Sequence, residues 1–135
     1  MRYSRQRKVI LEDLKNRKDH PTAEMVYQSV IKEVPKIGIA TVYRNLNALV
    51  NSGEILRIPG MDLPDRFDGN ANKHYHIRCR TCGKIEDIDP VNETMFLTAE
   101  KSIKNSFGFA EEDVEFGDVL FEYNCVNCRL SGYIE

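Results

Sequence analysis

Four cysteines are the residues of this sequence whose spacing most directly indicates chemistry. They form two pairs of equal spacing, Cys79-x-x-Cys82 and Cys125-x-x-Cys128, and the chain contains no other cysteine. Two thiolates separated by two residues can reach one metal ion, and two such pairs complete the tetrahedral sulfur set that Zn²⁺ takes in structural sites. Because a closed set of four thiolates leaves no open coordination position, we expect one zinc ion per chain that stabilises the fold and performs no chemistry.

The cysteines have two other interpretations that the sequence alone leaves open. Two disulfide bonds would require an oxidising compartment, whereas the thiols of cytosolic proteins stay reduced. A catalytic dithiol would need only one C-x-x-C pair, and two pairs of equal spacing fit a structural zinc better. The glycine after the first pair, Gly83, favours the tight turn of a zinc knuckle.

The histidines of the chain, together with nearby aspartates, form a second candidate metal site. His74-x-His76 places two imidazoles on one face of a predicted strand, because side chains alternate along a strand. Asp68 precedes them, Asp87 lies on the next predicted strand, and His20 belongs to the N-terminal half. Three imidazoles and two carboxylates suit a divalent ion such as Fe²⁺, Mn²⁺ or Zn²⁺.

Two questions about this second set stay open in the sequence. The short pattern H-x-H also occurs as ordinary solvated histidines on a protein surface. Glu86 competes with Asp87 as a ligand, and because the two are neighbours on one strand, only one of them can face the histidines.

Local patterns in the N-terminal half predict helices followed by a hairpin. Ser4 and Thr22 are suited to be N-caps, Pro21 interrupts the helical pattern, and Gly53 is suited to end a helix. Three helices are predicted: over residues 4–17, from residue 22 to a stop signalled by Pro35 and Gly38, and over 39–52. Two strands follow, over residues 54–58 and 65–68. This is the order of a winged helix, a helix-turn-helix whose third helix enters the major groove of DNA.

The solvent side of that third helix carries side chains of types that contact bases and phosphates. They are Thr41, Tyr43, Arg44, Asn45 and Asn47. An arginine forks onto O6 and N7 of guanine, and a ring or methyl group packs on the thymine methyl. DNA binding is therefore predicted, with an ordinary polar helix face as the alternative.

The C-terminal half is predicted to form strands with one helix. The strands cover residues 74–79, 84–88 and 118–124, the last of them buried, and the helix covers 91–106 with Met95, Phe96, Ala99 and Ile103 facing inward. The chain as a whole is predicted to be α+β. A winged-helix DNA-binding domain with its hinge occupies residues 1–68, and a small α/β domain with the structural zinc occupies residues 69–135.

Charge is distributed unevenly between the two halves. Residues 1–60 carry eleven Lys and Arg against six Asp and Glu, whereas residues 61–135 carry eight against fifteen, although the net charge is only −2. A basic half suggests that this half alone meets a polyanion, and chance scatter of surface charge is the alternative. With 41% hydrophobic residues, no apolar run long enough for a membrane helix and no signal peptide, we expect a cytoplasmic protein with no membrane partner.

Six motifs together resemble the ferric uptake regulator (Fur) family. They are His20-Pro-Thr-Ala, Ala40-Thr-Val-Tyr-Arg-Asn-Leu, Arg66-Phe-Asp68, His74-Tyr-His76, Cys79-x-x-Cys-Gly-Lys and Cys125-x-x-Cys128. The resemblance runs from Ser4 to Cys128 and is greatest to the peroxide-sensing (PerR) branch of the family. It implies a homodimeric repressor that binds a palindromic DNA operator, with the C-terminal domain as the dimerisation domain.

The resemblance also assigns the site residues. It places structural zinc on Cys79, Cys82, Cys125 and Cys128, and one regulatory Fe²⁺ or Mn²⁺ per chain on His20, Asp68, His74, His76 and Asp87. It implies that Tyr43 and Arg44 read DNA bases and that Arg2 reaches the minor groove. Histidines occur nowhere after His76, so the additional histidine-rich site of many iron-sensing relatives cannot form.

The function that follows is a metal-dependent repressor of oxidative-stress genes and not an enzyme. The resemblance implies that peroxide oxidises His20 or His74 at bound iron, and within it an aspartate at position 87, rather than a glutamate, accompanies peroxide sensing. The main alternative is a regulator of the same fold that senses the level of iron or another divalent metal. A metal-dependent hydrolase and a zinc-stabilised protein-interaction module are more distant alternatives.

Overall fold

The computed structural model describes residues 4–60, 62–72, 74–88, 94–108 and 119–131. The chain divides into two compact units, Met1–Ala71 and Asn72–Glu135. Within the described residues, every helix is too short or too polar to cross a membrane.

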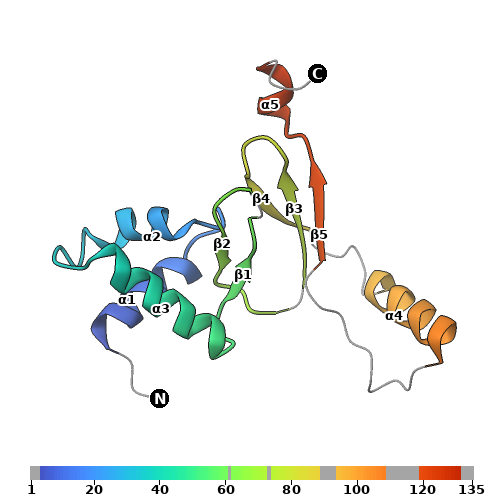
Figure 1. Ribbon diagram of the computed structural model, residues 1–135, viewed down its shortest axis with the longest axis horizontal. Helices are drawn as coiled ribbons and strands as arrows, with labels where there is room; N and C mark the ends of the chain where they lie inside the picture. The colour runs from blue at the N-terminus through green and yellow to red at the C-terminus, as the bar shows by residue number, and fades with distance from the viewer. Residues whose placement is uncertain (1–3, 61, 73, 89–93, 109–118, 132–135) are drawn as a thin grey trace. The chain divides into compact units, whose positions relative to one another are not determined.

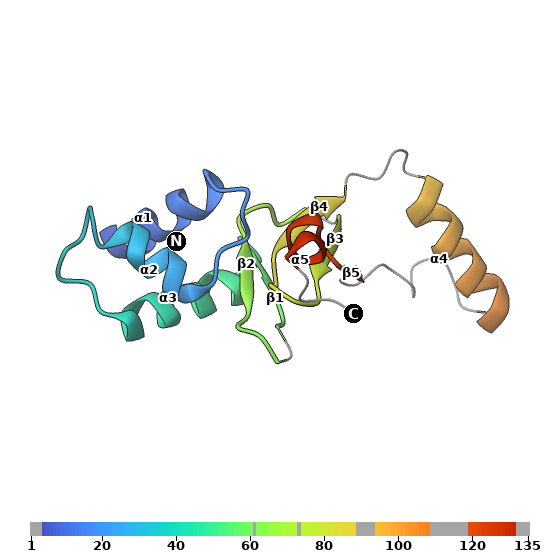
Figure 2. The ribbon, with the colours of Figure 1, turned by 90° about the horizontal axis from the view of Figure 1, so that it is seen from above.

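The first unit is a winged helix (Figures 1 and 2). It consists of α1 (Arg5–Lys15), α2 (Ala23–Val30), α3 (Ile39–Asn51), β1 (Leu56–Ile58) and β2 (Arg66–Asp68). The two strands pair antiparallel, with Leu56 opposite Asp68 and Ile58 opposite Arg66. The predicted order of three helices and a hairpin is confirmed.

Local capping groups fix where the helices of this unit begin and end. The Ser4 hydroxyl accepts a hydrogen bond from the Arg7 N–H at 3.2 Å, and the Thr22 hydroxyl accepts one from the Met25 N–H at 3.2 Å. Each bond satisfies one of the N–H groups that the first turn of a helix leaves without an intrahelical partner. Gly53 follows α3 at φ 78°, a left-handed conformation that favours glycine.

A single apolar core holds the three helices against the hairpin. Its buried members come from the three helices, from β2 and from residues just before α3 and β1: Ile10, Leu14, Ala23, Val26, Val30, Ile37, Val42, Leu46, Leu49, Ile55 and Phe67. Because the inner stripe of α3 belongs to this core, the opposite stripe of α3 remains on the surface of the unit.

Asn45 corrects one detail of the predicted solvent face of α3. The residue is buried, and its amide Oδ1 accepts a hydrogen bond from Arg7 Nε at 2.9 Å while Nδ2 donates to the Thr41 carbonyl at 2.9 Å. Position 45 lies three residues after Val42 and next to Leu46, so helical geometry places it at the edge of the core. Asn45 therefore joins α3 to α1 and is not a surface residue.

The second unit contains a mixed three-stranded sheet and two helices (Figures 1 and 2). Its elements are β3 (Tyr75–Cys79), β4 (Ile85–Ile88), α4 (Thr94–Phe107), β5 (Val119–Tyr123) and α5 (Val126–Leu130). The strand order is β4-β3-β5, with β3 antiparallel to β4 and parallel to β5. The short helix α5 was not predicted from the sequence, and residues 91–93 and 118 of the predicted elements lie outside the described residues.

Two residues of this unit that were predicted to face inward are exposed. The exposed fraction is 43% for Ile103 on α4 and 46% for Phe121 on β5. Apolar periodicity identifies an apolar face that must pack against another surface. It does not say whether that surface belongs to the same chain or to another one. The prediction of burial within this chain is therefore wrong for Ile103 and Phe121.

Candidate functional site

The four cysteines converge on one point in the second unit. The Sγ atoms of Cys79 and Cys128 are 3.8 Å apart, those of Cys82 and Cys125 are also 3.8 Å apart, and all four lie within 4.8 Å of one another. Zinc–sulfur bonds of about 2.3 Å in a tetrahedron place sulfur atoms about 3.8 Å apart. A disulfide would require about 2.0 Å, and all four cysteines are free. The predicted four-cysteine zinc site is confirmed, and the disulfide alternative is excluded.

A knuckle at the end of β3 presents the first cysteine pair. The Cys79 N–H donates to the Lys84 carbonyl at 2.9 Å, and the Gly83 N–H donates to the Cys79 carbonyl at 3.0 Å. Gly83 has φ 79°, which a residue with a side chain adopts at a cost. The glycine therefore permits the tight turn that carries Cys82 back towards Cys79.

The parallel pairing of β5 with β3 brings the second cysteine pair beside the first. Cys79 lies opposite Tyr123, so the chain leaves β5 directly next to the knuckle. Cys125 is the N-cap of α5 and its N–H donates to Cys79 Sγ at 3.4 Å, while Cys128 lies one turn further along the helix. The helix that the sequence did not predict thus positions half of the zinc ligands.

The surroundings of the cysteines shift the pKa of two of them in opposite directions. Burial raises the pKa of the Cys79 thiol, but backbone N–H donors, led by those of Cys125 and Cys82, outweigh it and lower the pKa to about 6. The hydrogen bond with Cys125 and then burial raise the pKa of Cys128 to about 12. Thiolates this close repel one another, and a divalent cation is what allows all four to ionise together.

In the second unit, two histidines face one carboxylate. His76 lies opposite Asp87 in the antiparallel pairing of β3 with β4, and His76 Nε2 is 3.3 Å from Asp87 Oδ1. His74 Nε2 is 2.8 Å from the same oxygen. Glu86 points to the other face of the sheet, where its carboxylate accepts a hydrogen bond from the Tyr123 hydroxyl at 3.1 Å. Strand register therefore turns the Asp87 carboxylate, and not that of Glu86, towards the histidines.

The tautomer of His74 fits a metal ligand. Its Nδ1 lies 2.6 Å from the Asn72 carbonyl oxygen, which can only accept, so Nδ1 carries a proton. In a neutral ring, Nε2 then presents a lone pair to the Asp87 carboxylate, and two lone pairs at 2.8 Å need a cation or a proton between them. A ligating histidine whose other nitrogen donates to a carbonyl is the usual arrangement in metal sites.

The first unit holds its own histidine–carboxylate pair. His20 Nε2 is 3.2 Å from Asp68 Oδ2, and both residues are buried. His20 has φ 51°, a left-handed backbone that strains a residue with a side chain. Arg66 on β2 holds this peptide, because its Nη1 donates to the His20 carbonyl at 3.2 Å. The strand that carries Asp68 thus also fixes the backbone of His20.

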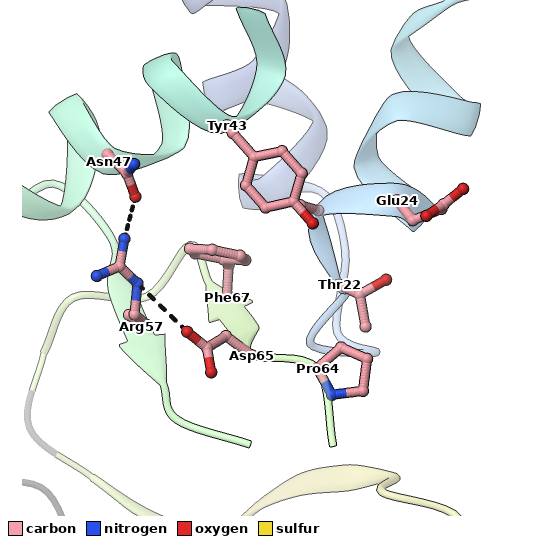
Figure 3. Close-up of a pocket in the computed structure, with 9 residues that line it drawn as sticks. Thr22, Glu24, Tyr43, Asn47, Arg57, Pro64, Asp65 and Phe67 are labelled. Atoms are coloured by element: carbon pink, nitrogen blue, oxygen red, sulfur yellow. Dashed lines mark hydrogen bonds and ion pairs between the residues drawn. The ribbon is translucent and has the colours of Figure 1, made fainter. Parts of the chain in front are cut away.

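The exposed face of α3 carries the residues predicted to read DNA. Tyr43 is 49% exposed, and Arg44 is exposed with its Nη2 donating to the Thr41 hydroxyl at 3.0 Å. Figure 3 shows Tyr43 and Asn47 projecting from α3 towards the β1–β2 hairpin, where they line a pocket. Arg2 lies outside the described residues, so its predicted role stays a prediction.

Comparison with known protein families identifies the family of this chain. The model of the "Ferric uptake regulator family" matches residues 1–116. The chain belongs to this family.

Individual relatives include regulators of both metal and peroxide responses. The peroxide-responsive repressor PerR of Staphylococcus aureus (strain USA300) is 40% identical over 88 residues, which are 65% of this chain and 60% of that protein. The Campylobacter jejuni peroxide stress regulator has a TM-score of 0.75 at 29% identity, covering 91% of this chain and 88% of that one. The Helicobacter pylori ferric uptake regulator shares the fold, with a TM-score of 0.80 at 22% identity over 96% of this chain and 83% of that one.

Proposed function

We propose that this protein is a metal-dependent, DNA-binding repressor that responds to hydrogen peroxide. In this proposal one regulatory ion is ligated by His20 and Asp68 together with His74, His76 and Asp87. The observation that carries it is the pairing of two imidazoles with Asp87, while Glu86 faces away from them. The 40% identity to a peroxide-responsive repressor supports the same conclusion.

The proposed ligands come from both units of the chain: His20 and Asp68 from the first, and His74, His76 and Asp87 from the second. This division explains how a bound ion would control DNA binding. An ion held by residues of both units would restrict the angle between them. In a homodimer on a palindromic operator, that angle sets the spacing of the two α3 helices, which must match half-sites about one helical turn apart. The exposed apolar side chains of Ile103 and Phe121 support dimerisation, because a second copy of the chain would bury them. Metal binding and DNA binding would then strengthen each other reciprocally.

The peroxide response in this proposal uses the histidines as sacrificial ligands. Iron held by these residues would supply the one-electron redox chemistry that cleaves the O–O bond of hydrogen peroxide, and manganese would supply it far less readily. One oxygen atom of hydrogen peroxide would be inserted at a ring carbon of His20 or His74 and the other would leave as water, and the altered ring would no longer ligate. DNA binding is then lost, and the repressed genes are expressed.

Comparison of two metal forms tests this function directly. We expect iron-loaded protein to lose operator binding after peroxide and manganese-loaded protein to retain it. Mass spectrometry of the iron form should show one added oxygen atom on the peptide of His20 or His74. If those peptides stay unmodified while cysteines are oxidised and zinc is released, the thiolate cluster is the sensor and the proposed mechanism is wrong.

The Asp87→Glu substitution should separate metal binding from peroxide sensing. Both side chains are carboxylates, so the charge at the site is preserved and metal-dependent DNA binding should remain. The longer side chain coordinates differently and crowds the position that peroxide must approach. We expect the iron form of Asp87→Glu to need at least about ten times more peroxide to lose operator binding than the wild type.

The matched control for this substitution is Glu86→Asp, which changes carboxylate length on the opposite face of β4. It should leave the peroxide response unchanged. Equal sensitivity of Asp87→Glu and wild type would contradict the assigned role of Asp87 and favour a regulator that senses metal level alone.

Arg44→Ala should weaken specific DNA binding by about 1–3 kcal/mol if Arg44 forks onto a guanine. Binding to non-specific duplex should change little. Arg44→Lys is the matched control, because it keeps the charge but loses the planar fork. Titration of operator and non-specific duplex by fluorescence anisotropy measures both affinities, and equal losses on the two duplexes would assign Arg44 to a phosphate.

A further inference from the structure

Arg57 joins the exposed face of α3 to the hairpin (Figure 3). This β1 residue donates a hydrogen bond from Nη2 to Oδ1 of Asn47, and its Nε lies 3.8 Å from Oδ2 of Asp65. Its guanidinium carbon lies 5.8 Å from the centre of the Phe67 ring, within the range of a cation–π contact. Arg57 therefore has a partner on α3, on the segment before β2 and on β2 itself.

The partners of Arg57 are themselves fixed in position. Asp65 Oδ1 accepts a hydrogen bond from the Gly60 N–H at 2.9 Å, which ties its carboxylate to the hairpin loop. Phe67 is 3% exposed and belongs to the core of the unit. A guanidinium held from two sides in this way presents its remaining N–H donors in a fixed direction.

This contact determines the orientation of the Asn47 side-chain amide, that is, the positions of its oxygen and its nitrogen. A guanidinium only donates hydrogen bonds, so the atom of Asn47 that meets it must be the carbonyl oxygen. The Asn47 NH₂ group, with two donors, is consequently the part of the exposed amide left to meet a ligand. An asparagine without such a partner can offer one donor and one acceptor, the pattern that matches N6 and N7 of adenine.

We propose that Arg57 is a positioning residue that sets the base preference of Asn47. This inference rests on the proposed DNA-binding function. With its oxygen held by Arg57, Asn47 favours a base edge made of acceptors, which in the major groove is O6 and N7 of guanine. It disfavours adenine, because the N6 amino group would have to share the amide oxygen that Arg57 already holds turned towards the hairpin. Tyr43, four residues earlier on α3, lines the same pocket and places Asn47 on the DNA-facing side.

The experiment begins with wild-type, metal-loaded protein and a pool of randomised DNA duplexes. Selection gives the preferred site, and single-base variants of it give the affinity ratio of guanine to adenine at each position. The Arg57→Met variant keeps an apolar stem against Phe67 and removes the hydrogen-bond donors. Because it also leaves the Asp65 carboxylate without its guanidinium, a second variant combines Arg57→Met with Asp65→Asn. We expect both to shift the guanine-to-adenine ratio towards adenine by about tenfold at one position per half-site.

The Asn47→Ala background shows whether Arg57 acts through Asn47. In this background, Arg57→Met should have no further effect on base preference, which a merely structural role of Arg57 would not predict. Asn51→Ala, at an exposed position of α3 outside the contacts of Arg57, is the matched control, with wild-type preference expected. Circular dichroism and thermal unfolding verify that each variant is folded.

Three results would overturn the inference. One is an unchanged ratio in folded Arg57→Met, and another is a uniform loss on all sequences, which would assign Arg57 and Asn47 to phosphates. The third is an equal shift by Arg57→Met in the Asn47→Ala background. Failure of the wild type to select any duplex would instead contradict DNA binding, so the two proposals fail in different ways.

Discussion

Cys79→Ser protein will lose its zinc and the folded state of the second unit. Cys79 is fully buried, holds the knuckle and receives the N–H of Cys125, so its sulfur joins both cysteine pairs. Structural zinc contributes about 10–16 kcal/mol to folding in small zinc domains, more than the total stability of most domains of this size. Elemental analysis should give about one zinc per wild-type chain and almost none in the variant, and circular dichroism should show a lost transition.

The first unit provides an internal control for this prediction. Its core contains no cysteine, so a transition belonging to the winged helix should remain in Cys79→Ser. Thr81→Ser is the matched variant, because it changes an exposed residue of the knuckle that offers no ligand to the cluster. A zinc-free Cys79→Ser protein with a stable second unit would contradict the structural role of the four cysteines.

His20→Asn protein will lose the dependence of DNA binding on the regulatory metal. His20 is the imidazole that the first unit contributes to the proposed ligand set, and its backbone is left-handed at φ 51°. Asparagine tolerates this conformation better than alanine, so the substitution removes the ligand without adding strain. Mutation of a residue that only hydrogen-bonds to a metal ligand typically lowers metal affinity about 10–100-fold. Because His20→Asn removes a proposed ligand itself, we expect the affinity for Mn²⁺ to fall at least about tenfold.

Two measurements distinguish loss of metal from loss of folding in His20→Asn. Calorimetric titration with Mn²⁺ reports the affinity, and thermal unfolding without added Mn²⁺ should match the wild type. Glu86→Gln, on the face of β4 away from the histidines, should keep both metal affinity and metal-activated operator binding. Full Mn²⁺ activation of His20→Asn would show that the four remaining ligands suffice and would remove His20 from the proposed site.

Local chemistry in the sequence was sufficient to predict most elements and the zinc cluster. Ser4 and Thr22 cap helices because each hydroxyl satisfies an N–H group only three residues away, which is a property of the local chain. The buried residues of α1, α2 and α3 recur at helical spacing, which is also a property of the local chain. Two C-x-x-C pairs indicated a tetrathiolate site because the spacing itself limits what the thiols can bind.

Contacts between distant segments decided what the sequence left open or predicted wrongly. The register of β3 against β4 turned Asp87 rather than Glu86 towards the histidines, and a shift of one residue would have reversed that choice. Asn45 is buried because Arg7, on another helix, satisfies its amide, and Asn47 is oriented by Arg57 on a strand. Such pairings depend on which surfaces pack together, and a pattern along one segment carries no information about the partner that packing supplies.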